Sequence, residues 1–159
     1  MADKLPIAEY QAACLTPVGW VAVATTDVAV TRVKILEDRP GLIASGENAL
    51  AAEACEALAT WLKGGDWPRF IALEPGGTAF QRRVWKALLN ILPGQTRTYG
   101  ELARELGSSP RAVGGACRRN PIPLLIPCHR VVAANGDGGF AGHTSGRWMD
   151  IKRWLLEHE

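Results

Sequence analysis

The chain has 159 residues, of which 47% are hydrophobic and 21% are charged, and its formal net charge is +2 at pH 7. This hydrophobic content is ample for a packed core, so we expect a soluble globule. No apolar run approaches the roughly 18 residues of a membrane span, and residues 1–11 lack the features of a signal peptide. We therefore expect a cytoplasmic protein, nucleoid-associated if bacterial, that makes no membrane contact.

The four cysteines, Cys14, Cys55, Cys117 and Cys128, are widely spaced, and all three histidines lie late in the chain. The sequence has no C-x-x-C pair and no metal-ligand spacing, which argues against a disulfide framework and a zinc site. We therefore predict no metal. Cys14, Cys55 and Cys117 are interpreted as small buried hydrophobic residues.

Charge is unevenly distributed along the chain. Residues 1–76 carry six Lys or Arg against ten Asp or Glu, whereas residues 77–159 carry twelve against six, so the halves have net charges of −4 and +6. A proline and two glycines mark the boundary. The asymmetry indicates that the second half meets an anionic partner such as nucleic acid, although scattered surface arginines would explain a milder version of it.

The first half, residues 1–76, is predicted to be a small α/β domain. Residues 20–25 and 29–36 are rich in β-branched side chains and are split by a polar pair, which predicts a hairpin. An Ala-rich helix is expected over residues 47–63, because its larger apolar side chains recur at helical spacing. Residues 69–73 are expected to form a third strand. No chemical motif lies in this half.

The second half, residues 77–159, opens with a predicted helix that ends at residues 93–94. Thr78 and Gln81 have the T-x-x-Q spacing of a capping box, which marks a helix start. Its apolar face is supplied by Phe80, Val84, Trp85, Leu88 and Leu89.

Two short helices are then expected with a tight glycine turn between them. Thr98 and Glu101 predict a capping box for the first helix, and Gly107 is expected to close it. The second helix begins near Pro110, is capped by one of the two serines before it, and ends at residues 120–121. This is a helix-turn-helix candidate, although such pairs also occur in proteins that bind no nucleic acid.

The local charge favours the nucleic-acid interpretation. Between residues 96 and 132 six arginines oppose two glutamates, which gives the segment a charge of +4. Gly114 and Gly115 inside a predicted helix each cost about 1 kcal/mol relative to alanine, so we expect another backbone to approach closely there.

Cys128 follows Pro127 at the end of what is predicted to be a short buried strand. A free cysteine with a pKa near ~8.5 is mostly protonated at neutral pH, so a reactive thiolate needs a base. His129 is adjacent, but neighbours in a strand point to opposite faces, so the pair cooperates only if the chain turns here. Pro127 favours such a turn. Arg130 adds positive charge, as a phosphate contact or as a surface ion-pair partner.

The run "NPIPLLIPCHRVV", residues 120–132, resembles the active-site segment of the O6-alkylguanine-DNA alkyltransferases, also called methylated-DNA–protein-cysteine methyltransferases. The resemblance covers residues 80–159 and includes "FQRRVWKAL", "TYGELA", "RAVGGA", "IPCHRV" and "KRWLLEHE" in the family's order. It implies a mainly α C-terminal domain, which contains a helix-turn-helix and the active-site cysteine loop, after the α/β N-terminal domain.

The resemblance also implies the reaction. Cys128 would attack the alkyl carbon on O6 of guanine in double-stranded DNA, leaving S-alkylcysteine and restored guanine. Because a thioether is a very poor leaving group, the protein would act once, as a suicide transferase without a cofactor. We expect a monomer that repairs damaged duplex DNA from the minor groove.

Three further catalytic residues are implied by the resemblance. Tyr99 would donate to the guanine ring as negative charge develops on it. His129 would deprotonate Cys128 through a water and be oriented by Glu159. The alternatives are a half-buried aromatic at a helix start for Tyr99 and a frayed terminus for Glu159.

The damaged base must rotate out of the stack to reach a buried thiol. Arg111 matches the family's arginine finger, which fills the vacated space while its helix enters the minor groove. Small residues in that helix would permit close approach to the DNA backbone. The expected DNA contacts are Arg111, Ala112, Gly114, Gly115, Arg118, Arg119 and Arg130.

The expected substrate pocket comprises Asn120, Val131, Phe140, Ala141 and Gly142. The Asn120 amide would tie the recognition region to the cysteine loop, with a helix C-cap as its alternative role. Backbone carbonyls of Val131 and Cys128 would face the guanine amino group, and the Ala141 amide would face O6. Phe140 replaces the family's tyrosine. The segment 142–152 is longer than the corresponding segment in the family. We expect it to be a lid or an extra DNA contact, and its length leaves open which size of alkyl group the pocket accepts.

Two other functions remain open from the sequence. One is an alkyltransferase-like protein that binds the lesion without transferring the alkyl group, against which the retained Cys128 argues. The other is a helix-turn-helix regulator with a structural cysteine, which would require Arg111, Arg118 or Arg119 to read base edges at a specific site.

Overall fold

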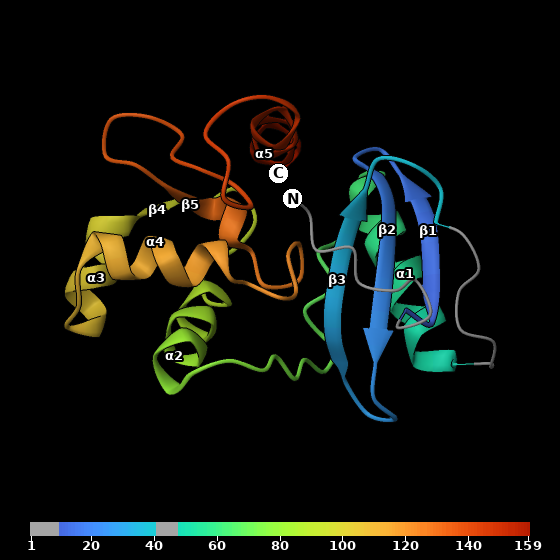
Figure 1. Ribbon diagram of the computed structural model, residues 1–159. Helices are drawn as coiled ribbons and strands as arrows, with labels where there is room; N and C mark the ends of the chain where they lie inside the picture. Colours follow the sequence, from blue (N-terminus) through green and yellow to red (C-terminus); the bar gives the residue numbers. More distant parts are fainter. Residues whose placement is uncertain (1–9, 41–47) are drawn as a thin grey trace. The chain divides into compact units, whose positions relative to one another are not determined.

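A computed structural model describes residues 10–40 and 48–159 and divides the chain into two compact units, Met1–Pro75 and Gly76–Glu159. Each unit is described by itself. The first contains an antiparallel sheet with a helix, and the second is mainly helical (Figure 1), which confirms the fold class predicted from the sequence. Among the described residues, no helix is long and apolar enough to cross a membrane.

The first unit is a three-stranded antiparallel sheet covered by a helix. Strands β1 (Ala12–Thr16), β2 (Gly19–Thr25) and β3 (Val30–Leu36) are hydrogen-bonded in that order. Helix α1 (Ala49–Leu62) packs against all three strands. Its N-cap is Asn48, whose Oδ1 accepts a hydrogen bond of 3.0 Å from an amide of the first turn, which satisfies a donor that the helix leaves unpaired.

The predicted hairpin and the Ala-rich helix are confirmed as β2, β3 and α1. The strand predicted over residues 69–73 is wrong, because only Leu73 pairs, in an isolated parallel bridge with Val30. Two backbone hydrogen bonds hold this bridge, Val30 N to Ala72 O at 2.9 Å and Glu74 N to Val30 O at 2.8 Å. The third strand is β1, whose alanines carry little β-propensity.

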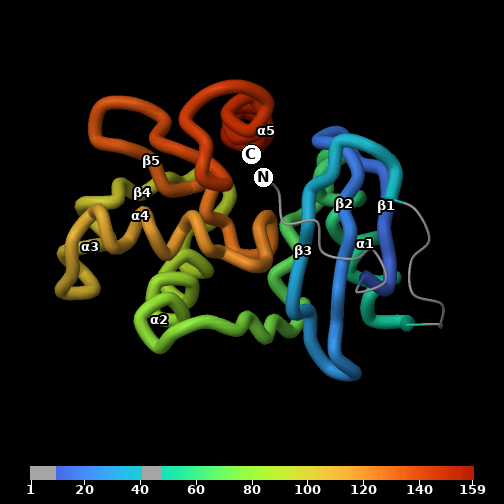
Figure 2. The backbone as a smooth tube through the Cα atoms, in the orientation of Figure 1, coloured from blue at the N-terminus to red at the C-terminus, as the bar shows by residue number. Residues whose placement is uncertain are grey.

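The second unit places its helices around a short parallel strand pair. Its elements are α2 (Ala79–Leu88), β4 (Arg97–Thr98), α3 (Tyr99–Leu106), α4 (Pro110–Arg118), the 3₁₀ helix η2 (Cys128–Arg130), β5 (Val131–Val132) and α5 (Arg147–His158). Helix α4 contacts both α2 and α3. Strands β4 and β5 pair in parallel, and a long loop leads from β5 to α5 (Figure 2).

Side-chain caps fix where α2 and α3 begin. The predicted capping box of α2 is confirmed: Gln81 N donates to Thr78 Oγ1 at 3.1 Å, and Thr78 N donates to Gln81 Oε1 at 3.0 Å. Only half of the second box forms, because Glu101 N donates to Thr98 Oγ1 whereas the Glu101 carboxylate contacts the Thr98 hydroxyl. The structure therefore confirms the helix start and corrects the predicted reciprocal bond.

The predicted helix pair α3–α4 is confirmed, with a turn of three residues between the helices. Gly107 ends α3 in the left-handed conformation at φ 64°, where a residue with a Cβ is disfavoured. Ser109 caps α4 by accepting a hydrogen bond of 3.1 Å from Ala112 N. Trp85 then ties α2 to α4, because its buried indole N–H donates to the Ala116 carbonyl at 2.8 Å. These local signals position α4 beside the residues that surround Cys128.

Replacing Thr78 with alanine should destabilise the second unit by about 1 kcal/mol, because the first turn of α2 loses the hydroxyl that accepts the Gln81 amide. The matched control is Thr78→Ser, which keeps the hydroxyl and should stay close to the wild type. Urea unfolding followed by far-UV circular dichroism measures both. Equal stability of the two variants would contradict this account of the helix start.

Candidate active site

The segment that carries Cys128 is a turn and not the predicted strand. Residues before it form turns with one isolated bridge between Pro123 and Ile126, and η2 begins directly after Pro127. The turn is closed by a hydrogen bond of 3.0 Å from Arg130 N to Pro127 O. The expected turn at Pro127 is therefore present, and Cys128 and His129 are not forced onto opposite faces as they would be in a strand.

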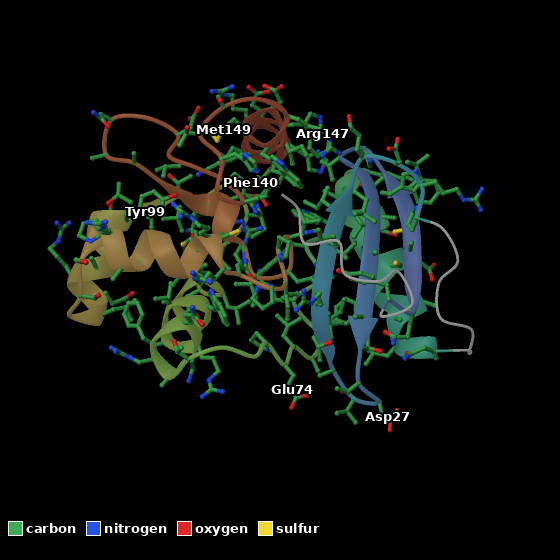
Figure 3. The ribbon with its side chains drawn as sticks, in the orientation of Figure 1. Asp27, Glu74, Tyr99, Phe140, Arg147 and Met149 are labelled. Atoms are coloured by element: carbon green, nitrogen blue, oxygen red, sulfur yellow. The ribbon has the colours of Figure 1, made fainter. Side chains whose placement is uncertain are left out.

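Cys128 lines a cavity of about 580 Å³, a volume typical of ligand sites. Both Cys117 and Cys128 are buried members of its lining, with Cys128 6% exposed. Tyr99 contributes a second wall from the start of α3, and Phe140 contributes a third from the loop after β5 (Figure 3). Helix α4 supplies the remaining side. The thiol is thus buried in the protein but faces an open space.

The cavity brings together about half of the site residues that the sequence predicts. Its predicted members are Tyr99, Arg111, Gly114, Gly115, Arg118, Cys128, Phe140, Ala141 and Gly142. Other predicted residues are absent from its lining, namely Ala112, Arg119, Asn120, His129, Arg130, Val131 and Glu159. The sequence analysis did not assign Pro110, Cys117 and Gly139 to the site, although they line the cavity. The lining residues His143 and Thr144 belong to the segment 142–152, which was expected to be a lid or an extra DNA contact. Several of the absent residues support Cys128 from the interior.

His129, the residue after Cys128, forms a buried pair with Glu159 at the end of α5. His129 Nε2 lies 2.9 Å from Glu159 Oε1, and the side chains are 0% and 1% exposed. The Arg130 guanidinium contacts the same carboxylate, with Nη2 at 2.6 Å from Oε1 and Nε at 2.9 Å from Oε2. The sequence predicts the first contact and misses the second.

Arg130 is a correction to the predicted DNA contacts. Its side chain is completely buried, and its Nη1 donates to the Ile91 carbonyl at 2.6 Å. With the rest of the guanidinium on Glu159, this arginine is turned inward and presents no charge at the surface. It joins η2 to the end of α5 and to the segment after α2, which makes it a structural cation.

The protonation states within this buried group follow from its contacts. Burial alone would raise the pKa of Glu159, but hydrogen bonds from His129 and Arg130 outweigh it and bring the pKa to about 2. Burial lowers the pKa of His129, against the attraction of Glu159, so the imidazole is neutral at physiological pH. Because a carboxylate only accepts hydrogen bonds, His129 Nε2 must carry the ring proton, and Nδ1 is then the basic nitrogen.

Burial raises the pKa of the Cys128 thiol, while a hydrogen bond from Asn120 and the charge of Lys152 act in the opposite direction. Asn120 is fixed by its own contacts, because Nδ2 donates to Ile126 O at 2.8 Å and Oδ1 accepts from Ile122 N at 2.9 Å. The amide thus bridges the end of α4 and the cysteine loop. The geometry agrees with the tie that the resemblance implies.

Lys152 is a functional candidate that the sequence analysis missed. Its side chain is 0% exposed, and Nζ donates to Val131 O at 2.6 Å and to Gly139 O at 2.8 Å. Burial lowers its pKa, whereas the thiols Cys128 and Cys117 and the carboxylate of Asp137 raise it. The available signal was its position: Lys152 falls on the buried stripe of α5 with Met149 and Leu155.

Tyr99 presents a neutral phenol to the cavity. Burial, followed by the nearby thiol Cys117, raises the pKa of Tyr99 to about 12, so its hydroxyl keeps its proton. The ring lies against Gly138, where an added Cβ would be 2.9 Å from Tyr99 Cε2. Only glycine fits beside this ring, at a residue whose φ is +75°. Tyr99 is therefore a hydrogen-bond donor held at a defined position.

The outer face of α4 carries positive charge without internal partners. Arg111, Arg118 and Arg119 are exposed, and within residues 10–40 and 48–159 no ion pair joins them to a carboxylate. Arg97, by contrast, pairs with two glutamates of α3. This face is available for an anionic ligand, as the charge pattern predicts.

The close backbone approach expected at Gly114 and Gly115 does not come from the described parts of the chain. An added Cβ at Gly115 would meet nothing within 4 Å, and one at Gly114 would meet only the ring of Tyr99, at 3.9 Å. The expected close approach of another backbone therefore stays a prediction for a partner outside the described chain, such as DNA. The two glycines leave this part of the α4 surface without side chains, next to the exposed arginines.

No group of three His, Cys, Asp or Glu side chains placed to hold a metal ion occurs in residues 10–40 and 48–159. The candidate chemistry centres on Cys128 with the imidazole of His129, the phenol of Tyr99 and the ammonium of Lys152. This is an arrangement for moving a proton from sulfur and for placing a donor on a bound molecule.

Comparisons with known proteins agree with this arrangement. The family model of the 6-O-methylguanine DNA methyltransferase DNA-binding domain matches residues 79–159. A methylated-DNA–protein-cysteine methyltransferase from Methanosarcina acetivorans is 50% identical over 91 residues, which are 56% of this chain and 56% of that protein. The chain thus spans little more than half of this relative's length.

Two further comparisons extend over both units. A methylated-DNA–protein-cysteine methyltransferase from Mycolicibacterium paratuberculosis is 38% identical over 149 residues, which are 91% of this chain and 88% of that protein. The solved structure of Mycobacterium tuberculosis OGT in complex with DNA is 34% identical, with a TM-score of 0.70, and covers 91% of this chain and 89% of that chain. A family model that matches more than half of the chain, and a relative that matches nearly all of it, show that the chain belongs to the methylated-DNA–protein-cysteine methyltransferase family.

Proposed function

We propose that this protein repairs O6-alkylguanine in double-stranded DNA by transferring the alkyl group to Cys128, once per molecule. The observation that carries the proposal is the position of Cys128, buried at a cavity of about 580 Å³ and backed by the His129–Glu159 pair. The family membership and the DNA-bound relative support DNA as the partner.

The reaction begins with removal of the thiol proton. In the proposed mechanism Nδ1 of neutral His129 accepts the Cys128 proton through a water, while Glu159 fixes the ring by accepting from Nε2. The positive charge of Lys152 and the Asn120 amide favour the sulfur anion that results. Glu159 remains ionised throughout, because its pKa of about 2 is far below that of the imidazolium.

The sulfur anion then displaces guanine from the alkyl carbon. One S–C bond forms as the C–O6 bond breaks, and the electron pair of the broken bond passes to the guanine ring. Tyr99, whose phenol is neutral, is positioned to donate to that ring and to stabilise the negative charge. Guanine is restored when it takes up a proton, and the thioether at Cys128 has no route back to a thiol.

The base reaches the cavity by rotating out of the duplex, with α4 in the minor groove. Arg111 lines the cavity mouth and is exposed, so it is placed to fill the space that the base leaves. Arg118 in the last turn of this helix and Arg119 directly after it would contact phosphates without reading sequence. Gly115 supports close approach, since nothing lies within 4 Å of an added Cβ there.

Intact-protein mass spectrometry tests the proposed function directly. After mixing with a duplex that carries one O6-methylguanine, the protein should gain a single CH₂ unit, because a methyl group replaces the thiol proton of Cys128. Cys128→Ser should gain nothing, whereas Cys117→Ser, which removes the other cavity thiol, should still be methylated. An unmodified wild-type protein would contradict the proposal and favour a lesion-binding role.

Removal of the Lys152 charge should raise the pKa of Cys128 further, because that charge favours the sulfur anion. Less thiolate is then present at neutral pH, so the midpoint of the rate profile moves to higher pH. Lys152→Gln keeps a donor for the Val131 and Gly139 carbonyls but loses the charge, whereas Lys152→Met loses both. Single-turnover methyl transfer measured across pH gives the midpoint, and thiolate absorbance compared with Cys128→Ser checks it.

If Lys152 had only a structural role, both variants would lower the rate by the same factor at every pH. Lys152→Arg replaces one cation with another and leaves Cys117 and Tyr99, which also interact with Cys128, in place. A retained midpoint in Lys152→Arg would support the charge as the cause.

Arg111→Ala should slow methyl transfer from a duplex by about tenfold, because the vacated stack is no longer filled. Transfer from the same oligonucleotide as a single strand should change little, since its base needs no extrusion. Arg104→Ala is the matched control, an exposed arginine on α3 outside the cavity. An equal loss with both substrates would contradict the proposed role and indicate a phosphate contact alone.

A further inference from the structure

Two of the four cysteines meet inside the first unit, between the sheet and its helix. Cys14 lies in the middle of β1 and Cys55 lies in the middle of α1, and these two elements pack together. The Cys14 thiol donates to the backbone carbonyl of Cys55 at 3.4 Å, across 41 positions of the sequence. The sulfur of the strand residue therefore lies against the helix residue that carries the second thiol.

The second thiol reaches in the opposite direction, from the helix to the sheet. Cys55 Sγ donates to the Val21 carbonyl at 3.9 Å, and Val21 is the residue of β2 that pairs with Cys14 across the two strands. The side chains of such a cross-strand pair lie on the same face of a sheet. The two thiols thus cross between the same points of the sheet and of α1, which brings their sulfur atoms side by side.

The two thiols differ in their access to solvent. Cys14 is only half-buried, unlike the small buried residue expected from the sequence, whereas Cys55 is 5% exposed. Strand β1 is an edge of the three-stranded sheet, in which the strands follow the order β1-β2-β3. A small solute can therefore reach Cys14 directly from solvent, and it can reach the sulfur of Cys55 only by way of Cys14.

The two thiols also differ in how readily they ionise. A hydrogen bond from Cys55 lowers the pKa of Cys14 against the effect of burial, and the charge of Lys63 acts in the same direction as that bond. The hydrogen bond with Cys14, together with burial, raises the pKa of Cys55. An accessible thiol that ionises easily, next to a buried thiol that keeps its proton, is the arrangement of cysteines that are oxidised reversibly.

We propose that Cys14 and Cys55 form a second reactive thiol site, which reduces a hydroperoxide and closes to a disulfide. The Cys14 thiolate attacks one peroxide oxygen, so that an S–O bond forms as the O–O bond breaks. The other oxygen leaves and takes up the proton that Cys14 released, as water or an alcohol. Cys55 sulfur then attacks Cys14 sulfur: the S–S bond forms, the S–O bond breaks, and the departing hydroxide takes up the Cys55 proton as water.

The two thiols lose two electrons in this reaction, and the peroxide gains them. The resulting bond would join the edge strand β1 covalently to α1. The site goes beyond the proposed alkyl transfer and does not depend on it, because Cys14 and Cys55 lie in the first unit and neither lines the cavity at Cys128.

Peptide mapping after oxidation of the whole chain tests the inference. The reduced protein is treated with a limiting amount of hydrogen peroxide, free thiols are blocked with a maleimide, and the protein is digested without reductant. Before blocking, the intact protein should have lost two hydrogen atoms, and the digest should contain the Cys14 peptide linked to the Cys55 peptide. A link between Cys117 and Cys128, which share a cavity, or between Cys14 and a second chain would overturn the inference.

Single replacements separate the attacking thiol from the resolving one. In Cys55→Ser the sulfenic acid of Cys14 has no thiol partner, so it should persist and be trapped by dimedone. In Cys14→Ser the buried Cys55 should stay reduced, and oxidation of Cys55 to the wild-type extent would overturn the inference. Cys117→Ser is the matched control, because it removes a buried thiol of the second unit and should leave the link unchanged. Cys14 is half-buried in an edge strand, so its variant gives an answer even if Cys55→Ser fails to fold.

Discussion

The Glu159 carboxylate is the contact on which the site geometry depends. It accepts hydrogen bonds from both His129 and Arg130, two residues that are consecutive in the 3₁₀ helix η2. Arg130 in turn reaches the Ile91 carbonyl, so one carboxylate fixes the end of α5, the cysteine loop and the segment after α2 together. Loss of this one anion would leave a buried guanidinium without its counter-charge, a strongly destabilising change. The Glu159 carboxylate therefore fixes both the orientation of the His129 ring and the path of the chain at Cys128.

In the proposed mechanism the buried charges near the cavity favour the anion of Cys128, against the burial that raises its pKa. Burial opposes a sulfur anion, but Arg130 and Lys152 bring two positive charges into the interior against the single negative charge of Glu159. Neutral His129 adds none. Ionisation of Cys128 would add a second negative charge and bring the net charge of these buried side chains to zero. The thiol proton would leave through the imidazole of His129. Such a balance is a property of the folded domain, because the contributing residues come from η2 and α5, which lie far apart along the chain.

Sequence reasoning succeeded where the signal was local and failed where it was not. The capping residues Thr78 and Ser109 and the closing glycine Gly107 act through their own turns, so their positions could be predicted. The segment before Cys128 is apolar and was expected to be a strand, but prolines on either side leave it without a ladder to join. The partners of Arg130 and Lys152 could not be inferred from the sequence, because they lie 13 to 39 residues away along the chain. The cavity contribution of His143 depends on a turn in which alanine adopts positive φ, which no propensity predicts.

The two hydrogen bonds that Lys152 makes to carbonyl groups carry a consequence for the spent protein. Before reaction this ammonium shares the interior with a sulfur that can become an anion. After the proposed transfer the sulfur would be a thioether, which holds no ionisable proton. The ammonium would then keep its hydrogen bonds to the Val131 and Gly139 carbonyls but lose the sulfur anion as a counter-charge. A protein molecule that has reacted would thus differ from an unreacted one in its internal charge balance as well as in its covalent structure.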